Sequence, residues 1–320
     1  MNSNLYRNQR IALLVPCYNE EKAIRTVVRD FRAAMPELDI FVFDNSSTDK
    51  TAEFAQAEGA TVIRVDLRGK GNVVRRMFGD VDADLYVMVD GDATYDAGSI
   101  HQLVDKLLDQ HLDMVVGCRK VATDSLGIAY RHGHEWGNRV LTGSVMNIFG
   151  GSFTDMLSGY RVFTRRFVKS FPALVQGFET ETELTVHALE LRMPYGELVT
   201  PYGARPEGSE SKLSTYGDGW RILKMVGRLY VAERPLAFFG ICGAFLATLS
   251  VALAVPIIEI YLVEGLVPRL PTAVLAASLM ISAMLSFCCG LILDTVTRGR
   301  QEMKRLAYLS IPLPNVGGKS

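Results

Sequence analysis

Short apolar runs that alternate with helical patterns organise the first 215 residues. Five runs have the length of buried strands, at 11–15, 39–43, 61–65, 85–89 and 114–116. Between them, apolar residues recur every three or four positions, most clearly over 100–108. Strands that alternate with helices form parallel sheets with helices on both faces. The pattern therefore predicts an α/β domain with a mostly parallel sheet.

Two long segments near the C-terminus, Leu236–Ile258 and Leu270–Leu293, contain no charged residue. A helix rises about 1.5 Å per residue, so each segment is long enough to cross a hydrocarbon core of about 30 Å. The alternative is a pair of buried helices in a soluble core, but such helices rarely run this far without a polar edge. We therefore expect two transmembrane helices.

The charged residues around these segments predict their orientation. Basic residues outnumber acidic ones in 216–235 and in 294–320, whereas the connecting loop 259–269 holds a single arginine. Positive residues favour the cytoplasmic side of a membrane, so the domain 1–215 and both termini are expected in the cytoplasm. We expect 216–235 to form an amphipathic juxtamembrane helix and 294–320 a basic tail. The N-terminus lacks the apolar region of a cleaved signal peptide.

Composition excludes several classes of protein. The net charge is −1, the mean hydropathy is +0.15, and 48% of the residues are hydrophobic. Nucleic-acid-binding proteins normally carry a strong basic excess, and disordered chains have few apolar residues, so neither class fits. The five cysteines have neither the pattern of a disulfide framework nor the spacing of a zinc site.

Polar clusters follow three of the predicted strands. They are Pro16-Cys17-Tyr18-Asn19-Glu20, Asp44-Asn45 and Asp90-Gly91-Asp92. Open α/β sheets bind ligands beyond the carboxyl ends of their strands, so we expect these clusters to meet in one crevice. Two carboxylates one residue apart suit a hard divalent cation such as Mg²⁺ or Mn²⁺. A solvated acidic turn is the alternative interpretation of the last cluster.

Basic residues further along the chain are candidates for an anion site. Lys70 lies between two glycines, which fits close approach to a diphosphate but also fits a flexible basic turn. Arginine suits phosphate because its guanidinium is a planar donor fork. The candidate arginines, for each of which a structural ion pair is the alternative, are Arg119, Arg131, Arg139 and Arg161. Arg205 and Lys212 lie in a polar loop that is either a lid or a linker.

Three glutamates, Glu179, Glu181 and Glu183, precede an apolar helical pattern. Acids are favoured at a helix N-terminus by the helix dipole, and a catalytic role fits equally well. His187, on the same helix, is expected to be structural.

Seven ordered motifs resemble the family 2 glycosyltransferases, in particular the branch that acts on polyprenyl phosphates. They are VPCYNEE, FDNSSTDKTAE, GKGNVVRRMF, VDGDATYD, SGYRVFTR, GFETETELTVHALE and ARPEGSESKLS, and they span about residues 10 to 215. The resemblance implies a GT-A fold, which is Rossmann-like, and two C-terminal membrane helices are usual in bacterial members. It also implies a nucleotide-sugar donor, a polyprenyl phosphate acceptor and inversion at the anomeric carbon.

The resemblance also implies roles for individual residues. Asp90 and Asp92 match the metal-binding pair, for Mg²⁺ or Mn²⁺, and with Arg119 and Arg139 they form the expected catalytic set. The expected nucleotide-sugar-binding residues are Pro16, Tyr18, Asn19, Glu20, Asp44, Lys70, Asp90, Gly91, Asp92, Arg205 and Lys212. The expected acceptor-phosphate residues are Arg119, Arg139, Ser158 and Arg161. The sequence departs from the family pattern at Asn45, where a second acid is usual, and at Thr94, where a glutamine is usual.

A single transfer from a nucleotide sugar, with UDP favoured, to a polyprenyl phosphate follows from these expectations. A phosphate monoester is largely dianionic at pH 7, so it is a nucleophile that needs no strong base. Two alternatives remain open. A glycan or lipid hydroxyl acceptor would require Glu181 or Glu183 as a base, and a nucleotide-sugar sensor would bind donor without turnover. Membrane lipids and another copy of the chain are further expected partners, and nucleic acid is not.

Overall fold

The computed structural model describes residues 5–121, 142–146, 148–173, 180–203, 224, 227–228 and 230–314. The chain divides into two compact units. The first comprises Met1–Gly219 together with Met303–Ser320, and the second is Trp220–Glu302.

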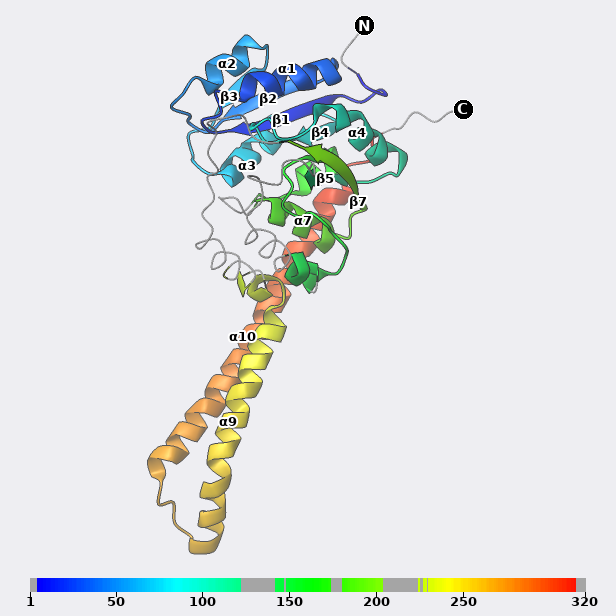
Figure 1. Ribbon diagram of the computed structural model, residues 1–320. Coiled ribbons are helices and arrows are strands. Elements are labelled where there is room, and N and C mark those ends of the chain that lie inside the picture. Colours follow the sequence, from blue (N-terminus) through cyan, green and yellow to red (C-terminus); the bar gives the residue numbers. More distant parts are fainter. Residues whose placement is uncertain are drawn as a thin grey trace. The chain divides into compact units, whose positions relative to one another are not determined.

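The strands described in the first unit form one sheet in the order β3-β2-β1-β4-β6-β5-β7. Figure 1 labels all of these strands except β6. Their bounds are β1 (Ile11–Cys17), β2 (Asp39–Asp44), β3 (Thr61–Arg64), β4 (Leu85–Met88), β5 (Met114–Val121), β6 (Arg161–Thr164) and β7 (Tyr195–Tyr202). All pairings are parallel except those of β6, which is antiparallel to both β4 and β5. The mostly parallel α/β sheet predicted from the sequence is confirmed.

Helices connect and cover these strands. Their bounds are α1 (Ile24–Ala34), α2 (Thr51–Ala57), α3 (Lys70–Asp80), α4 (Ile100–Asp109), α6 (Arg165–Ser170) and α7 (Thr180–Glu190). The apolar positions of α4 that recur at helical spacing are all buried. On α1, Phe31 packs edge-on against Tyr160 beside the sheet, with ring centroids 5.8 Å apart. Strands β1 and β4 are buried throughout except at Pro16, as expected for central strands covered on both faces.

Strand β6 determines which loop lies beside the end of β4. Arg161, the first residue of β6, pairs with Met88, the last residue of β4. Because the two strands are antiparallel, the chain that enters β6 lies next to the chain that leaves β4. Gly159 is thereby brought to Asp90. The sequence did not predict β6, since this four-residue strand carries a buried arginine and a buried threonine.

The second unit contains two long apolar helices, α9 (Pro235–Glu264) and most of α10 (Leu270–Leu309). Both are long and apolar enough to cross a membrane. They form an antiparallel pair (Figure 1), in which Ser250 donates to Ala276 O at 2.7 Å and Ser286 to Phe239 O at 2.9 Å. Close packing depends on Gly243, where a Cβ would lie 3.1 Å from Ala283 O. Small residues and hydroxyl donors are typical of helix contacts in lipid.

The last turns of α10 belong to the first unit. Tyr308 Oη donates to Asp113 Oδ2 at 2.7 Å, and Lys304 Nζ donates to Glu190 Oε2 at 2.6 Å. Both acids are almost completely buried, so each needs such a partner. The residues predicted as a basic tail, 294–320, therefore include a helix that continues to Leu309.

His187 lies in the apolar interior near this contact, as a structural histidine. Its ring packs edge-on against Phe167, and Nε2 lies 3.0 Å from Ser170 Oγ. Burial, and then the charge of Lys304, lower the pKa of His187 to about 3. The imidazole is therefore neutral in the folded protein.

Candidate active site

Asp90 lies directly beyond β4 at the centre of the candidate site. Its Oδ1 accepts from Lys70 Nζ at 2.5 Å, and Lys70 Nζ also contacts Glu181 Oε1. Burial would lower the pKa of Lys70, but the carboxylates of Asp90 and Glu181 outweigh it and raise the pKa above the ordinary value. Lys70 therefore stays an ammonium between two carboxylates.

The Asp92 carboxylate is bonded to a different residue from the Asp90 carboxylate. Its Oδ1 accepts from Thr94 Oγ1 at 2.6 Å within a buried turn. Gly91 separates the two acids and packs against the end of β1. A Cβ at Gly91 would lie 2.5 Å from Cys17 Sγ, so this position has no room for a side chain. The glycine thereby lets the acidic turn approach the end of β1.

Gly159 leaves the space that the Asp90 carboxylate fills. A Cβ at Gly159 would lie 2.3 Å from Asp90 Oδ2. The Gly159 N–H donates to Tyr95 Oη at 2.8 Å, which fixes the loop in place. Burial raises the pKa of Tyr95, so its hydroxyl stays neutral. The roles of Gly159 and Tyr95 are not predictable from the sequence, because the residues that they contact are distant in the chain.

The loops after β1 and β2 are bound to each other. Asn19, in the left-handed region with φ 52°, donates its N–H to Ser47 Oγ and accepts from the Thr48 N–H at 2.8 Å. The Glu20 N–H donates to Thr51 Oγ1, and the Asp44 carboxylate accepts from the Ser47 N–H. Asn19, Glu20 and Asp44, three of the residues expected to bind the nucleotide, thus lie close together at the carboxyl edge of the sheet.

Pro16 and Tyr18 flank the end of β1. Pro16 still pairs with β2 and the strand continues to Cys17, two residues beyond the predicted end at Val15. The guanidinium carbon of Arg68 lies over the Tyr18 ring, 5.2 Å from the centroid of the ring. Arg68 lies in the segment that leads into Lys70, so this contact joins the first loop to the lysine loop.

Asn45, a departure from the family pattern, holds the segment that carries Lys70. Its Nδ2 donates to Val65 O at 3.0 Å and Leu67 O at 2.8 Å, and its Oδ1 accepts from the Gly69 N–H at 2.8 Å. A carboxylate could accept the last bond but could not donate the first two. The amide therefore secures the loop that positions the lysine.

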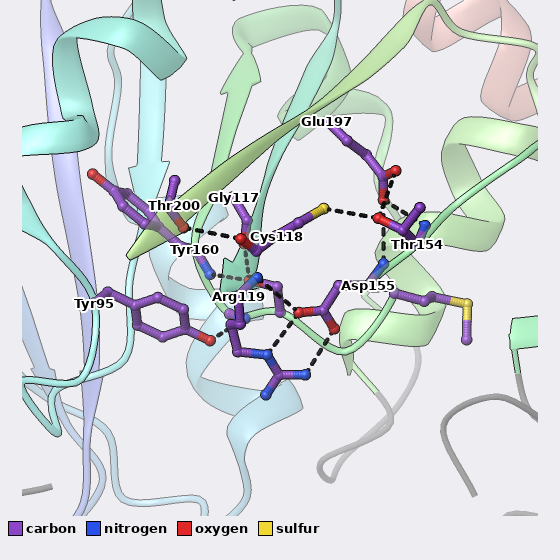
Figure 2. A network of polar contacts seen from close by, with 12 residues as sticks. Tyr95, Gly117, Cys118, Arg119, Thr154, Asp155, Tyr160, Glu197 and Thr200 are labelled. Carbon is purple, nitrogen blue, oxygen red and sulfur yellow. Dashed lines mark hydrogen bonds and ion pairs between the residues drawn. The ribbon is translucent and has the colours of Figure 1, made fainter. Parts of the chain in front are cut away.

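Arg119, at the end of β5, forms a two-pronged ion pair with Asp155 (Figure 2). Nε and Nη2 lie 2.7 Å from the two carboxylate oxygens. Asp155 also accepts from the Arg119 N–H at 3.2 Å, and the guanidinium lies 5.6 Å from the centroid of Tyr202. The ion pair fixes the guanidinium plane of this predicted catalytic arginine.

A second part of the network lies behind this ion pair. Glu197 accepts from the N–H and hydroxyl of Thr154, and Cys118 Sγ lies 3.3 Å from Thr154 Oγ1 (Figure 2). Burial raises the pKa of Cys118 to about 12, so the thiol is neutral. These contacts hold Thr154, the residue directly before Asp155, in place.

Ser158 and Arg161 are both fully buried. Ser158 Oγ donates to Gly117 O at 2.5 Å, and Arg161 donates to Ser158 O, Met156 O and Thr185 Oγ1. Their side chains brace the loop that places Gly159 against Asp90. Both side chains are therefore bonded within the protein, and their contact with the acceptor phosphate stays a prediction.

Several predicted residues lie outside the described part of the chain. They are Arg131, Arg139, Glu179, Arg205 and Lys212. Within the described part, the structure brings the end of β4, the lysine loop and the start of α7 together. Glu181 and Glu183 are confirmed as acids in the first turn of that helix.

The chemistry of Asp90 fits a cation, because one of its oxygens already binds an ammonium. Among the described residues, no group of three His, Cys, Asp or Glu side chains is arranged to hold a metal ion. A pair of carboxylates with substrate phosphates and water is the usual environment of Mg²⁺. Asp90 and Asp92 are therefore suited to a metal that is completed by a phosphorylated ligand.

The fold and the sequence place this chain in a known class of enzyme. It belongs to the family 2 glycosyltransferases, since the family model "Glycosyl transferase family 2" matches residues 12–171. Glycosyltransferase AglJ of Haloferax volcanii is 31% identical over 301 residues, which are 93% of this chain and 98% of that protein.

Two further similarities extend the comparison. Dodecaprenyl-phosphate galacturonate synthase of Rhizobium johnstonii is 23% identical, over 90% of this chain and 88% of that protein. Among solved structures, glucosyl-3-phosphoglycerate synthase of Mycobacterium tuberculosis, in complex with Mn²⁺, UDP-glucose and phosphoglyceric acid, has a TM-score of 0.56 at 23% identity. That alignment covers 67% of this chain and 77% of the other. The last similarity shows the GT-A fold.

Proposed function

We propose that this glycosyltransferase transfers one sugar from a nucleotide diphosphate sugar, with UDP favoured, to a polyprenyl phosphate. The observation that carries the proposal is the Asp90 carboxylate, bonded to the Lys70 ammonium at the carboxyl end of β4, with Asp92 two residues further on. The name of the Rhizobium relative, a dodecaprenyl-phosphate galacturonate synthase, supports a polyprenyl phosphate acceptor. Two helices apolar enough to span a membrane would keep the enzyme where such a lipid is found. The basic flanks favour the cytoplasmic face.

The transfer is a single displacement with inversion. A phosphate oxygen of the acceptor attacks the anomeric carbon, the bond from that carbon to the diphosphate breaks, and the nucleoside diphosphate leaves with the bonding electrons. The acceptor phosphate is largely dianionic near pH 7, so no proton has to be removed from it. Bringing two anions together and stabilising the leaving group are the remaining difficulties.

The residues of this chain address both difficulties. Arg119, held flat by Asp155, would bind the acceptor phosphate together with Arg139. Lys70 would bind the donor diphosphate, with Arg205 and Lys212 closing over it. Asp90 and Asp92 would hold Mg²⁺ or Mn²⁺, which supplies positive charge for the departing diphosphate. The structural relative that binds Mn²⁺ and UDP-glucose supports a divalent metal.

The donor loops would bind the nucleotide itself. Pro16, Tyr18, Asn19 and Glu20 follow β1, and Asp44 ends β2, at the edge where open α/β sheets bind ligands. Asp44 would contact the base. Gly91 would allow close approach of the acidic turn to the donor.

The contacts of Glu181 weigh against the hydroxyl-acceptor alternative. A catalytic base must reach the proton it removes, but the Glu181 side chain is 7% exposed and paired with Lys70. Glu183 is half-buried and remains the other candidate base. A phosphate acceptor needs neither residue.

The proposal is tested by turnover of the purified full chain in detergent with undecaprenyl phosphate, Mg²⁺ or Mn²⁺, and a panel of UDP-, GDP- and TDP-sugars. Mass spectrometry should find one sugar added from one preferred donor, and EDTA should abolish the product. The double variant Asp90→Ala/Asp92→Ala should be inactive. Full turnover by that variant would refute the metal assignment.

A further inference from the structure

Three charged side chains from distant parts of the chain meet beyond β4. The Lys70 ammonium contacts both Asp90 Oδ1, at 2.5 Å, and Glu181 Oε1. The side chains of Lys70 and Glu181 are 12% and 7% exposed, whereas that of Asp90 is 29% exposed. Asp90 is therefore the most accessible member of a largely buried triad of charged side chains, Lys70, Asp90 and Glu181.

The triad gives Asp90 two competing cations. The oxygen that faces the ammonium is part of the carboxylate that the proposed function assigns to a divalent metal ion. A divalent ion close to a shielded ammonium is repelled by it, because Coulomb interactions are strong where water is scarce. Full engagement of Asp90 by a metal thus requires Lys70 to withdraw from it.

We propose that Lys70 is a place-holding cation that competes with the divalent metal ion for Asp90 in the donor-free enzyme. Glu181 is the positioning residue that keeps the Lys70 ammonium at this site. The inference rests on the proposed function, because it takes Asp90 and Asp92 as the metal ligands.

The arrangement couples binding of the metal to binding of the nucleotide. A donor diphosphate offers the ammonium new acceptor oxygens, and Lys70 then leaves Asp90 available to the cation. By thermodynamic linkage, nucleotide raises the affinity for metal by the same factor as metal raises the affinity for nucleotide. In the absence of donor, Lys70 offsets the repulsion between Asp90 and the buried carboxylate of Glu181.

The test measures Mn²⁺ binding to the purified full chain, without nucleotide, from the electron paramagnetic resonance signal of free Mn²⁺. The variant Lys70→Met/Glu181→Gln removes one positive and one negative charge, so its net charge equals that of the wild type. We expect it to bind Mn²⁺ about tenfold more tightly, within the usual range of coupling between sites. Thermal unfolding confirms that the variant is folded.

Two further variants serve as controls. Lys70→Arg keeps a cation at the site and should keep the weaker, wild-type affinity. Arg76→Met removes a positive charge from an exposed ion pair with Asp80 on the same helix, and should leave Mn²⁺ affinity unchanged. Mn²⁺ affinity in Lys70→Met/Glu181→Gln that is equal to or weaker than wild type would overturn the proposal.

Two more measurements separate this proposal from the proposed function. Asp92→Asn should weaken Mn²⁺ binding, and if it does not, the metal assignment itself fails. If Asp92→Asn weakens binding while the double variant binds like wild type, only the place-holding role fails. In the wild type, UDP should raise the affinity for Mn²⁺, and this gain should shrink in the double variant. No effect of UDP on wild-type Mn²⁺ affinity would contradict the proposal without any variant.

Discussion

The substitution Gly159→Ala tests whether the space beside Asp90 is needed for catalysis. The added Cβ would lie 2.3 Å from Asp90 Oδ2 and 2.8 Å from Asp90 Cγ. Carbon and oxygen atoms in ordinary contact are about 3.4 Å apart, so the carboxylate must move by about 1 Å. Gly159 does not have a positive φ, so alanine adds no backbone strain. The displaced group is the carboxylate that we assign to the metal.

A displacement of about 1 Å at a reacting centre costs on the order of 100-fold in rate. We therefore expect kcat/KM for sugar transfer to fall about 100-fold, which corresponds to about 2.7 kcal/mol of lost transition-state stabilisation. Overpacking should also lower the free energy of unfolding by about 1–3 kcal/mol. The assay measures the initial rate of lipid product formation. A thermal unfolding curve of each protein measures its stability.

Gly79→Ala is the matched control. Gly79 lies in α3, and a Cβ there would meet no atom within 4 Å. Gly79 is the next-to-last residue of α3 and does not have a positive φ, so alanine removes no contact there and this variant should keep wild-type activity and stability. Wild-type kcat/KM in a folded Gly159→Ala protein would refute the reasoning.

Three further predictions concern the site and its support. Gly91→Ala should lose activity because its Cβ would lie 2.5 Å from Cys17 Sγ, and Cys17→Ala in the same chain should restore part of it; no rescue in this double-mutant cycle would argue against that contact. Tyr308→Phe removes a donor from the buried Asp113 carboxylate and should lower the free energy of unfolding by about 1–3 kcal/mol, seen as a lower Tm; an unchanged Tm would show that the contact is not formed. The folded-state pKa of His187, about 3, lies below its unfolded value of about 6.5, so the unfolded chain takes up a proton first as pH falls. Stability should therefore decline from about pH 6.5 towards pH 3 by up to roughly 1.4 kcal/mol per unit, and His187→Gln should flatten this decline in urea titrations; an equally steep decline in the variant would count against the account.

The central strands and the two apolar helices can be predicted from the sequence, because each produces a pattern within one short segment of the chain. Central parallel strands are buried on both faces and therefore appear as continuous apolar runs, which is how β1 and β4 were found. The acidic turn at Asp90 was found for the same reason, since it directly follows such a run. The two apolar helices were found from length and lack of charge alone.

Contacts between distant parts of the chain were not predictable in the same way. Lys70 and Glu181 are 111 positions apart, and their ion pair exists only because α3 and α7 both begin near the end of β4. Strand β6 cannot be recognised from its pattern, because it begins with an arginine and ends with a threonine and is therefore not a continuous apolar run. Its antiparallel pairing nevertheless decides that Gly159 lies against Asp90.

The residue type of an arginine also does not show whether its side chain is buried or accessible. Arg161 has the residue type of a phosphate-binding group, but the structure buries it completely and satisfies it with protein oxygens. Arg119 has the same residue type and is only partly buried, with its guanidinium fixed by Asp155. The difference arises from position, because Arg161 begins β6, which is buried at every position, whereas Arg119 lies towards the carboxyl end of β5.

The most direct test of the central claim compares undecaprenyl phosphate with undecaprenol as acceptors for the preferred donor. The account predicts that only the phosphate is glycosylated, with one sugar per lipid, an acid-labile linkage and an anomeric configuration opposite to that of the donor. Transfer to the free alcohol, repeated addition, or retention of configuration would contradict it.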